Sequence, residues 1–233
     1  MGWQDTRDDV LHEVDLLVDQ VAALPDEAFA TATAACAGWS VGDVVAHVAR
    51  VMDAQQEAFG RAMGGSTETP PYEPASFTSV AAAREALDAA AELATATYAA
   101  LTDEHADRFV PLPVSTLPLE LALDVVLLEY GSHRWDVGSA DDPGADLSAA
   151  AAAAVLRVAP ALLTFFGAPP PDEPVAYRIG AIDVTNRDGV WVLEPGADPV
   201  VVDGSDSDLA LFLLGRRDID GRLAAFKTWF PGP

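Results

Sequence analysis

The chain has 233 residues, with 37 Asp and Glu residues against 13 Lys and Arg residues, a formal net charge of −24. Half of the residues are hydrophobic, which excludes a disordered acidic tail, because such segments lack the apolar side chains that offset the entropy of ordering. The acidity argues against nucleic acid and anionic membranes as partners, since both would repel the protein. We therefore expect a globular protein with a small-molecule or protein partner.

The cysteine count and the N-terminus indicate the compartment. Cys36 is the single cysteine, so no intrachain disulfide can form and a reducing environment is expected. Asp5, Asp8 and Asp9 stand where a signal peptide would be basic and then apolar. The longest apolar run, residues 149–155, falls far short of the ~20 residues of a membrane span. We expect a cytoplasmic protein, either a monomer or a homodimer.

The first part of the chain is patterned as helices. Apolar residues recur at three-and-four spacing over residues 9–24, and Pro25 ends that pattern. Ser40, followed three residues later by Asp43, is close to a capping box and predicts a second helix start. Prolines predict loops over residues 66–74 and 110–117. The predicted helices span residues 9–24, 40–63, 79–101, 119–137 and 148–166.

The proline-rich segment 168–174 separates these helices from a region of different period, because closely spaced prolines cannot continue a helix. Strands are predicted at residues 175–184, 190–193 and 200–202, and short helices at 206–214 and 223–230. The fold class is α+β. We expect an all-α helical bundle over residues 1–167, a linker over 168–174, and a small α+β domain over 175–233.

Two predicted helices carry ionisable residues on their apolar faces. His47 lies between Val44 and Val48, and Glu129 precedes His133 by four residues, so one helix face presents both side chains. A buried carboxylate needs a charged partner, hydrogen bonds or a metal. One His plus a Glu-x-x-x-His pair is a ligand set that Zn²⁺ takes in catalytic sites, with a fourth position open. From spacing alone, a hydrogen-bonded core histidine or a helix-surface ion pair explains these residues equally well.

Three segments resemble signatures of the mycothiol-dependent maleylpyruvate isomerase family. Residues 34–49 contain Gly-Trp-Ser-Val leading into the helix with His47, and residues 128–136 read Leu-Glu-Tyr-Gly-Ser-His-Arg-Trp-Asp. Residues 212–216, Phe-Leu-Leu-Gly-Arg, are similar to the family's C-terminal Leu-Trp-Gly-Arg segment, with Leu214 where tryptophan is usual. The resemblance thus spans nearly the whole chain, in the family's order.

The resemblance implies a DinB-like four-helix metal-binding bundle followed by a small domain distantly similar to sterol carrier proteins. It implies His47, Glu129 and His133 as ligands of Zn²⁺, or of another divalent metal such as Ni²⁺. It also implies Arg216 as the catalytic arginine, although Arg217 and Arg222 lie nearby. Mycothiol would be the thiol cosubstrate of an isomerase or S-transferase, and an electrophile the second small-molecule partner.

Other functions remain open at the level of sequence. The same ligands would serve a hydrolase that uses metal-bound water. A non-catalytic, metal-containing protein that binds a lipid or another small molecule is a further alternative. Cys36 is either a packing residue or a reactive thiol, and Trp39 either packs or lines a thiol pocket. Asp136 either orients His133 or caps Arg134.

Overall fold

A computed structural model describes residues 2–33, 35–74, 76–219 and 224–230. The chain divides into two compact units, Met1–Ala145 and Asp146–Pro233. This boundary precedes the proline-rich segment at which the sequence analysis divided the chain. The fifth helix, α5 (Ala149–Phe166), belongs to the second unit because it packs against α6 (Asp206–Leu213). No helix in the described part of the chain is both long and apolar enough to cross a membrane.

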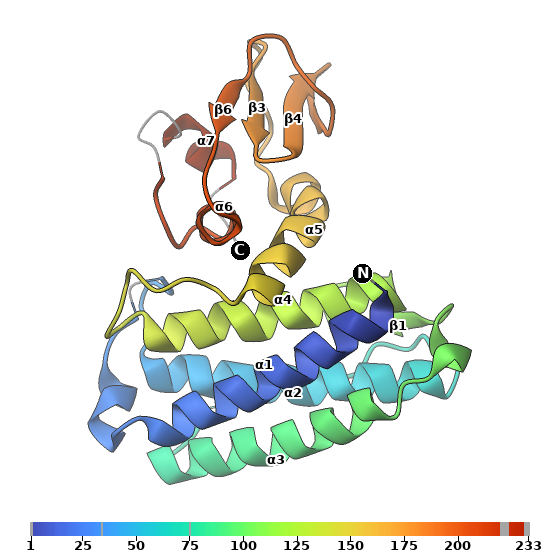
Figure 1. The fold of residues 1–233 in the computed structure, drawn as a ribbon, viewed down its shortest axis with the longest axis vertical. Coiled ribbons are helices and arrows are strands. Elements are labelled where there is room, and N and C mark those ends of the chain that lie inside the picture. Colours follow the sequence, from blue (N-terminus) through green and yellow to red (C-terminus); the bar gives the residue numbers. More distant parts are fainter. Residues whose placement is uncertain (1, 34, 75, 220–223, 231–233) are drawn as a thin grey trace. The chain divides into compact units, whose positions relative to one another are not determined.

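Four helices form the first unit (Figure 1). Both α1 and α2 pack against α3 and α4, which makes a four-helix bundle and confirms the predicted architecture. The first helix begins well before residue 9, because the Asp5 carboxylate accepts the backbone N–H of Gly2 at 2.9 Å and caps it. The bounds are α1 Trp3–Ala23, α2 Val41–Met63, α3 Val80–Ala99 and α4 Leu119–Gly138, with short 3₁₀ turns η1 Asp26–Ala30 and η2 Asp103–His105.

The start of α2 is fixed by the predicted capping box. The Ser40 hydroxyl accepts the N–H of Asp43 at 3.2 Å, and the Asp43 carboxylate accepts the N–H of Ser40 at 2.8 Å. Just upstream, Gly38 has φ +84°, a left-handed conformation that favours glycine. The N–H of Thr33 donates to the carbonyl of Trp39 at 2.9 Å and closes the turn. This turn sets the positions of the side chains that enter the bundle beside α2.

The prediction of a loop over residues 110–117 is wrong. The structure has an antiparallel hairpin there, β1 (Phe109–Pro111) with β2 (Thr116–Pro118), in which Val110 pairs with Leu117. Pro111 and Pro118 each lie at the end of a strand, and Pro113 lies in the connection between the strands. A two-stranded ribbon leaves one backbone edge of each strand unpaired, so these prolines are compatible with it. Val110 is fully buried and ties the hairpin to the bundle.

The second unit contains a four-stranded sheet in the order β5-β4-β3-β6, antiparallel except for the parallel pair β3–β6. The single strand predicted over 175–184 is a hairpin, because the chain reverses at Gly180, where φ is +54°. Asp188 and Gly189, both with positive φ, make the turn between β4 and β5. The bounds are β3 Ala176–Ile179, β4 Ile182–Arg187, β5 Val190–Val192, β6 Val200–Val202 and α7 Ala224–Trp229. The α+β fold class is confirmed.

Candidate metal centre

The bundle brings together the three residues that the sequence analysis selected. His47 lies on α2, and Glu129 and His133 lie one turn apart on α4. Nε2 of His47 is 3.0 Å from Glu129 Oε1, and Nε2 of His133 is 3.2 Å from the same oxygen. The two imidazole centroids are 4.9 Å apart. Both rings therefore direct the same type of nitrogen at one carboxylate oxygen.

The second nitrogen of each imidazole also has a partner. His133 Nδ1 lies 2.8 Å from Oδ2 of Asp136, whose side chain is fully buried. His47 Nδ1 lies 3.3 Å from the hydroxyl of Tyr72, a residue in the segment between α2 and α3. Such partners orient a metal-ligating imidazole, and a carboxylate, which only accepts, also fixes its tautomer. Asp136 therefore orients His133, which was one of its two predicted roles.

Burial and neighbouring charges shift the pKa values of Glu129 and His133 in opposite directions. Burial alone would raise the pKa of Glu129, but His133 and then His47 hold that pKa well below its usual range. Burial likewise disfavours the charged form of His133, yet Glu129 and then Asp136 raise its pKa well above the ordinary value. Glu129 is thus a carboxylate at neutral pH, as a metal ligand must be.

The donor set fits a divalent metal. Within the described residues, two groups of three have ligand atoms within 4.8 Å of one another, and both include His133: His47–Glu129–His133 and Cys36–His133–Asp136. Two imidazoles and a carboxylate suit Zn²⁺, and also Ni²⁺ and other first-row ions. In the second group, Asp136 lies on the Nδ1 side of His133, so an ion at Nε2 leaves the Nδ1–H bond to Asp136 intact.

The three candidate ligands differ in their exposure to solvent. The side chains of His47 and Glu129 are 25% and 22% exposed, whereas that of His133 is 10% exposed. Trp39 is exposed, and its ring centroid lies 5.1 Å from that of His47. The His47 side of the group is therefore more exposed than the His133 side, and Trp39 and Tyr72 flank the imidazole of His47.

Neighbouring residues hold α4 in position. Arg134 forms an ion pair with Glu13 of α1, and Glu13 is almost completely buried. The indole of Trp135 donates to the carbonyl of Ala145 at 2.7 Å. Cys36 is half-buried, with Sγ 3.5 Å from Oδ2 of Asp136. Arg134 and Trp135 of α4 thus contact other parts of the protein, whereas Glu129 and His133 of the same helix face His47.

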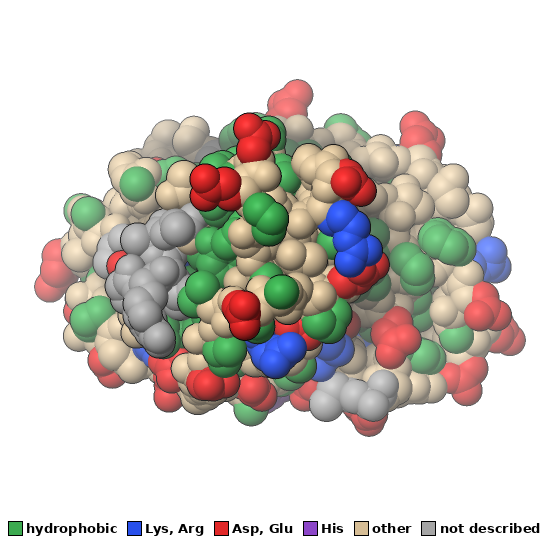
Figure 2. Space-filling model, turned by 90° about the horizontal axis from the view of Figure 1, so that it is seen from above, with side chains coloured by type: hydrophobic (Ala, Val, Ile, Leu, Met, Phe, Trp, Pro, Cys, Tyr) green, Lys and Arg blue, Asp and Glu red, His purple; other side chains and the backbone are tan. Residues whose placement is uncertain are grey.

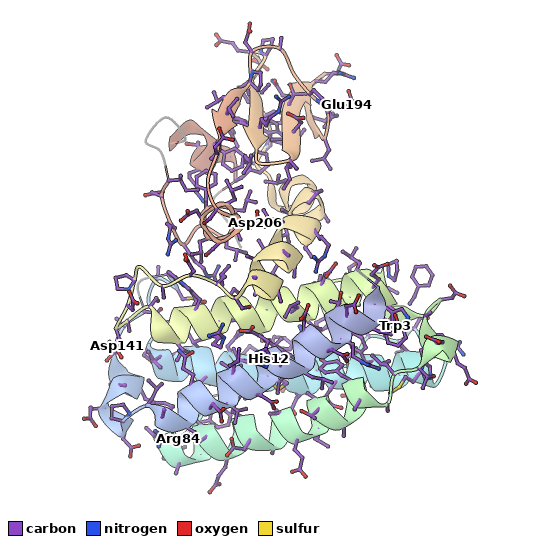
Figure 3. All side chains as sticks on the ribbon, in the orientation of Figure 1. Trp3, His12, Arg84, Asp141, Glu194 and Asp206 are labelled. Atoms are coloured by element: carbon purple, nitrogen blue, oxygen red, sulfur yellow. The ribbon has the colours of Figure 1, made fainter. Side chains whose placement is uncertain are left out.

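The remaining histidines of the chain lie elsewhere. His12 is an exposed residue of α1 (Figure 3), and Nδ1 of His105 accepts the N–H of Thr102 at 3.0 Å. Tyr72 was missed by the sequence analysis, because a single aromatic residue in a proline-rich loop has no periodicity that could place it beside His47.

The arginines near residue 216 belong to the second unit. Nη1 of Arg216 donates to the carbonyl of Leu214 at 3.1 Å. Arg217 forms ion pairs with Asp208 at 2.7 Å and Asp146 at 3.2 Å. Arg222 lies outside the described residues. Arg216 as the catalytic arginine therefore remains a prediction.

The fold and the site together define the class of protein. It has two units, and its helical bundle carries a candidate metal centre with two imidazole nitrogens and one carboxylate oxygen as donors. A sequence profile of the mycothiol maleylpyruvate isomerase N-terminal domain matches residues 10–138, more than half of the chain. The chain belongs to this family, and the family resemblance in its motifs is confirmed.

Solved structures extend the similarity to both units. A crystal structure of the mycothiol-dependent maleylpyruvate isomerase matches with a TM-score of 0.68 and 17% identity, over 93% of this chain and 90% of the other. A histidine-to-alanine mutant of that enzyme matches with a TM-score of 0.70 and 18% identity, over the same shares. At this identity the likeness establishes the fold. No protein of curated function matches the sequence.

Proposed function

We propose that the protein is a metal-dependent, thiol-utilising enzyme, a mycothiol-dependent isomerase or S-transferase similar to maleylpyruvate isomerase. One observation carries this proposal: both imidazoles direct Nε2 at the same Glu129 oxygen, within 3.2 Å. Family membership supports the choice of thiol, because the matching profile and structures are those of mycothiol-dependent enzymes. We propose Zn²⁺ as the ion, with Ni²⁺ as the alternative.

The residues of the chain would divide the work. A divalent ion held by His47, Glu129 and His133 supplies Lewis acidity, which favours the thiolate form of a thiol that is otherwise mostly protonated at neutral pH. Glu129 offsets part of the ion's charge, and Asp136 holds His133 in the tautomer that leaves Nε2 free to ligate. Because the His47 side of the group is the more exposed one, the thiol and the electrophile would both approach past Trp39.

Arg216 is the proposed contact for an anionic substrate. A planar guanidinium can bind a carboxylate in bidentate fashion and stabilise a developing enolate, which suits a substrate such as maleylpyruvate. Acidic side chains are spread over the face in Figure 2, with few basic ones among them. An anion would therefore be repelled by the protein as a whole, so that binding it requires local positive charge. Arg216→Lys should raise KM for an anionic electrophile more than for a neutral one.

Metal analysis and thiol conjugation test the proposal together. Purified wild type should hold about one zinc per chain. It should accelerate mycothiol addition to the double bond of maleylpyruvate, or mycothiol displacement of halide from a haloarene. His47→Ala and Glu129→Gln should lose both the metal and the rate, while His12→Ala, an exposed histidine of the same bundle, should keep both. Folding of every variant is checked by circular dichroism. A wild type that binds neither zinc nor nickel after loading would refute the metal-dependent function.

The same assay separates the alternatives. Turnover of an ester or amide without any thiol would replace the proposal with a hydrolase. Saturable binding of a fluorescent fatty acid by a metal-loaded protein that conjugates no thiol would indicate a binding protein.

A further inference from the structure

The segment between α2 and α3 lies against the proposed metal centre. Residues 70–74, Pro-Pro-Tyr-Glu-Pro, are called the strap here. Arg50 of α2 holds it by the backbone: Nε donates to the carbonyl of Glu73 and Nη2 to that of Pro71, both at 3.0 Å. The Arg50 guanidinium also lies 5.9 Å from the centroid of the Tyr72 ring. Since Arg50 is one turn after His47, a single face of α2 carries both the anchor of the strap and a ligand.

Tyr72 is the side chain through which the strap meets the site. Its hydroxyl is 3.3 Å from His47 Nδ1, on the opposite side of the ring from the nitrogen that faces Glu129. The phenol of a tyrosine is protonated at neutral pH, because its ordinary pKa is about 10. A protonated phenol can both donate and accept a hydrogen bond.

These contacts distinguish the two imidazoles. His133 is backed by a fully buried carboxylate on its own helix, whereas His47 is backed by a hydroxyl from a separate segment. Without an ion, Nε2–H of His47 can donate to Glu129 while Nδ1 accepts from Tyr72. With an ion at Nε2, the proton must be on Nδ1, and Tyr72 becomes the acceptor. A hydroxyl serves both tautomers, which a carboxylate cannot do.

We infer that Tyr72 is a positioning residue for the metal centre, and that the strap, held by Arg50, sets the affinity of His47 for the ion. This inference rests on the proposed metal-dependent function and names a determinant of it outside the ligands. Because binding free energies are reciprocal, an ion that is bound more tightly when Tyr72 is in place must also hold Tyr72 in place more firmly.

Metal affinity is the first measurement. The zinc dissociation constants of wild type and variants are compared by competition with a chromophoric chelator. Tyr72→Phe keeps the ring but removes the hydroxyl, and it should weaken zinc binding about 10-fold, the lower end of the usual effect of losing such a partner. Arg50→Ala should weaken binding to a similar extent by releasing the strap.

Arg61→Ala is the matched control. Arg61 also lies on α2 and also holds this connecting segment by backbone carbonyls, at Glu68 and Thr69, but outside the strap. Its zinc affinity should stay within two-fold of wild type. If Tyr72→Phe binds zinc as wild type does, or if Arg61→Ala weakens binding equally, the inference is overturned. A wild type that binds neither zinc nor nickel refutes the proposed function instead.

Reciprocity provides a second readout that does not depend on affinity. Chymotrypsin cleaves after Tyr and after Phe, so it can cut after residue 72 in both wild type and Tyr72→Phe. Saturating zinc should slow this cut about 10-fold in wild type and little in Tyr72→Phe, with the products assigned by mass spectrometry. Equal protection by zinc in both proteins would contradict the role of the hydroxyl.

Discussion

The two units of the chain bury different kinds of side chain. Among the described residues, the buried acidic and histidine side chains all lie in the bundle, and they are Glu13, Asp124, His133 and Asp136. The buried polar residues of the second unit, Thr185 and Ser207, are neutral. Its core is mainly aliphatic and aromatic, with Tyr177, Phe212, Phe226 and Phe230 in contact around α6 and α7.

The two units are therefore stabilised in different ways. Burying a charge costs free energy unless hydrogen bonds and opposite charges compensate, and the bundle meets that cost with paired groups around the candidate centre. The second unit gains its stability from buried apolar surface, which needs no compensating hydrogen bonds or opposite charges. The stability of the bundle should therefore depend on metal and on changes in charge, and the stability of the second unit on changes in packing.

The largest expected effect is a packing change in the second unit. Phe226 is fully buried against Tyr177, Phe212 and Phe230, so Phe226→Ala should destabilise this unit by about 3–5 kcal/mol. Hydrogen exchange of peptides from β3 and β4 would measure the loss. Leu193→Ala, at an exposed leucine of the same unit, is the control and should change little. Equal effects of the two variants would refute the assignment of the core.

A charge change in the bundle comes next. Glu13→Gln leaves Arg134 beside a neutral amide and should cost about 2–3 kcal/mol, below the full value for a buried pair because Arg134 is 21% exposed. Chemical denaturation followed through peptides of α1 and α4 would report it. Asp15→Asn alters an exposed carboxylate on the same helix and should be nearly neutral. A neutral result for Glu13→Gln would mean that the ion pair adds no net stability.

Metal should stabilise the bundle alone. At a zinc concentration 100 times the dissociation constant, amides of α2 and α4 should gain about 2.7 kcal/mol of protection against exchange. Peptides from β3 to β6 should exchange at unchanged rates, and a chelator should reverse the gain. Protection confined to the second unit would place the ion elsewhere.

The smallest effect concerns Lys227, the only lysine of the chain. Its ammonium donates to the carbonyl of Phe212 and lies 4.2 Å from the Phe212 ring centroid; burial lowers the pKa of Lys227 to about 8, against a favourable contribution from Asp218. The unfolded chain, with a pKa near 10.5, binds more protons between these values, so the stability of this unit should rise from pH 8 to pH 10.5.

Lys227→Met removes that dependence. It should stabilise the second unit at pH 7 by about 1 kcal/mol, a figure discounted because the ammonium is partly exposed. Thermal unfolding at several pH values would measure the difference. A wild type whose stability is flat across this pH range would show that the ammonium is well solvated.

Helix patterning predicted most of the bundle, because apolar periodicity and the Ser40 cap act locally. It failed at the β1–β2 hairpin and at Gly180, where pairing between short segments decides the structure and proline or glycine is compatible with both outcomes. The unit boundary was also missed. The sequence of α5 predicts a helix but does not reveal that it packs against α6.

The clustering of the three candidate ligands was predictable for a related reason. Glu129 and His133 share a face through helix geometry, and His47 stands out on an apolar face. Tyr72 was not predictable, because its position depends on how Arg50 holds the backbone of the strap. Residues placed by regular structure can be inferred from spacing, whereas residues placed by irregular backbone cannot.

The exposed Trp39 beside His47 gives the site an optical property. An indole ring 5.1 Å from an imidazole, and open to water, emits light whose intensity and wavelength depend on the charge and polarity next to it. Occupancy of the centre by an ion or a thiol would change those surroundings. The protein thus carries its own fluorescent reporter, with which ligand binding can be followed without a label and identified by loss of the signal in Trp39→Phe.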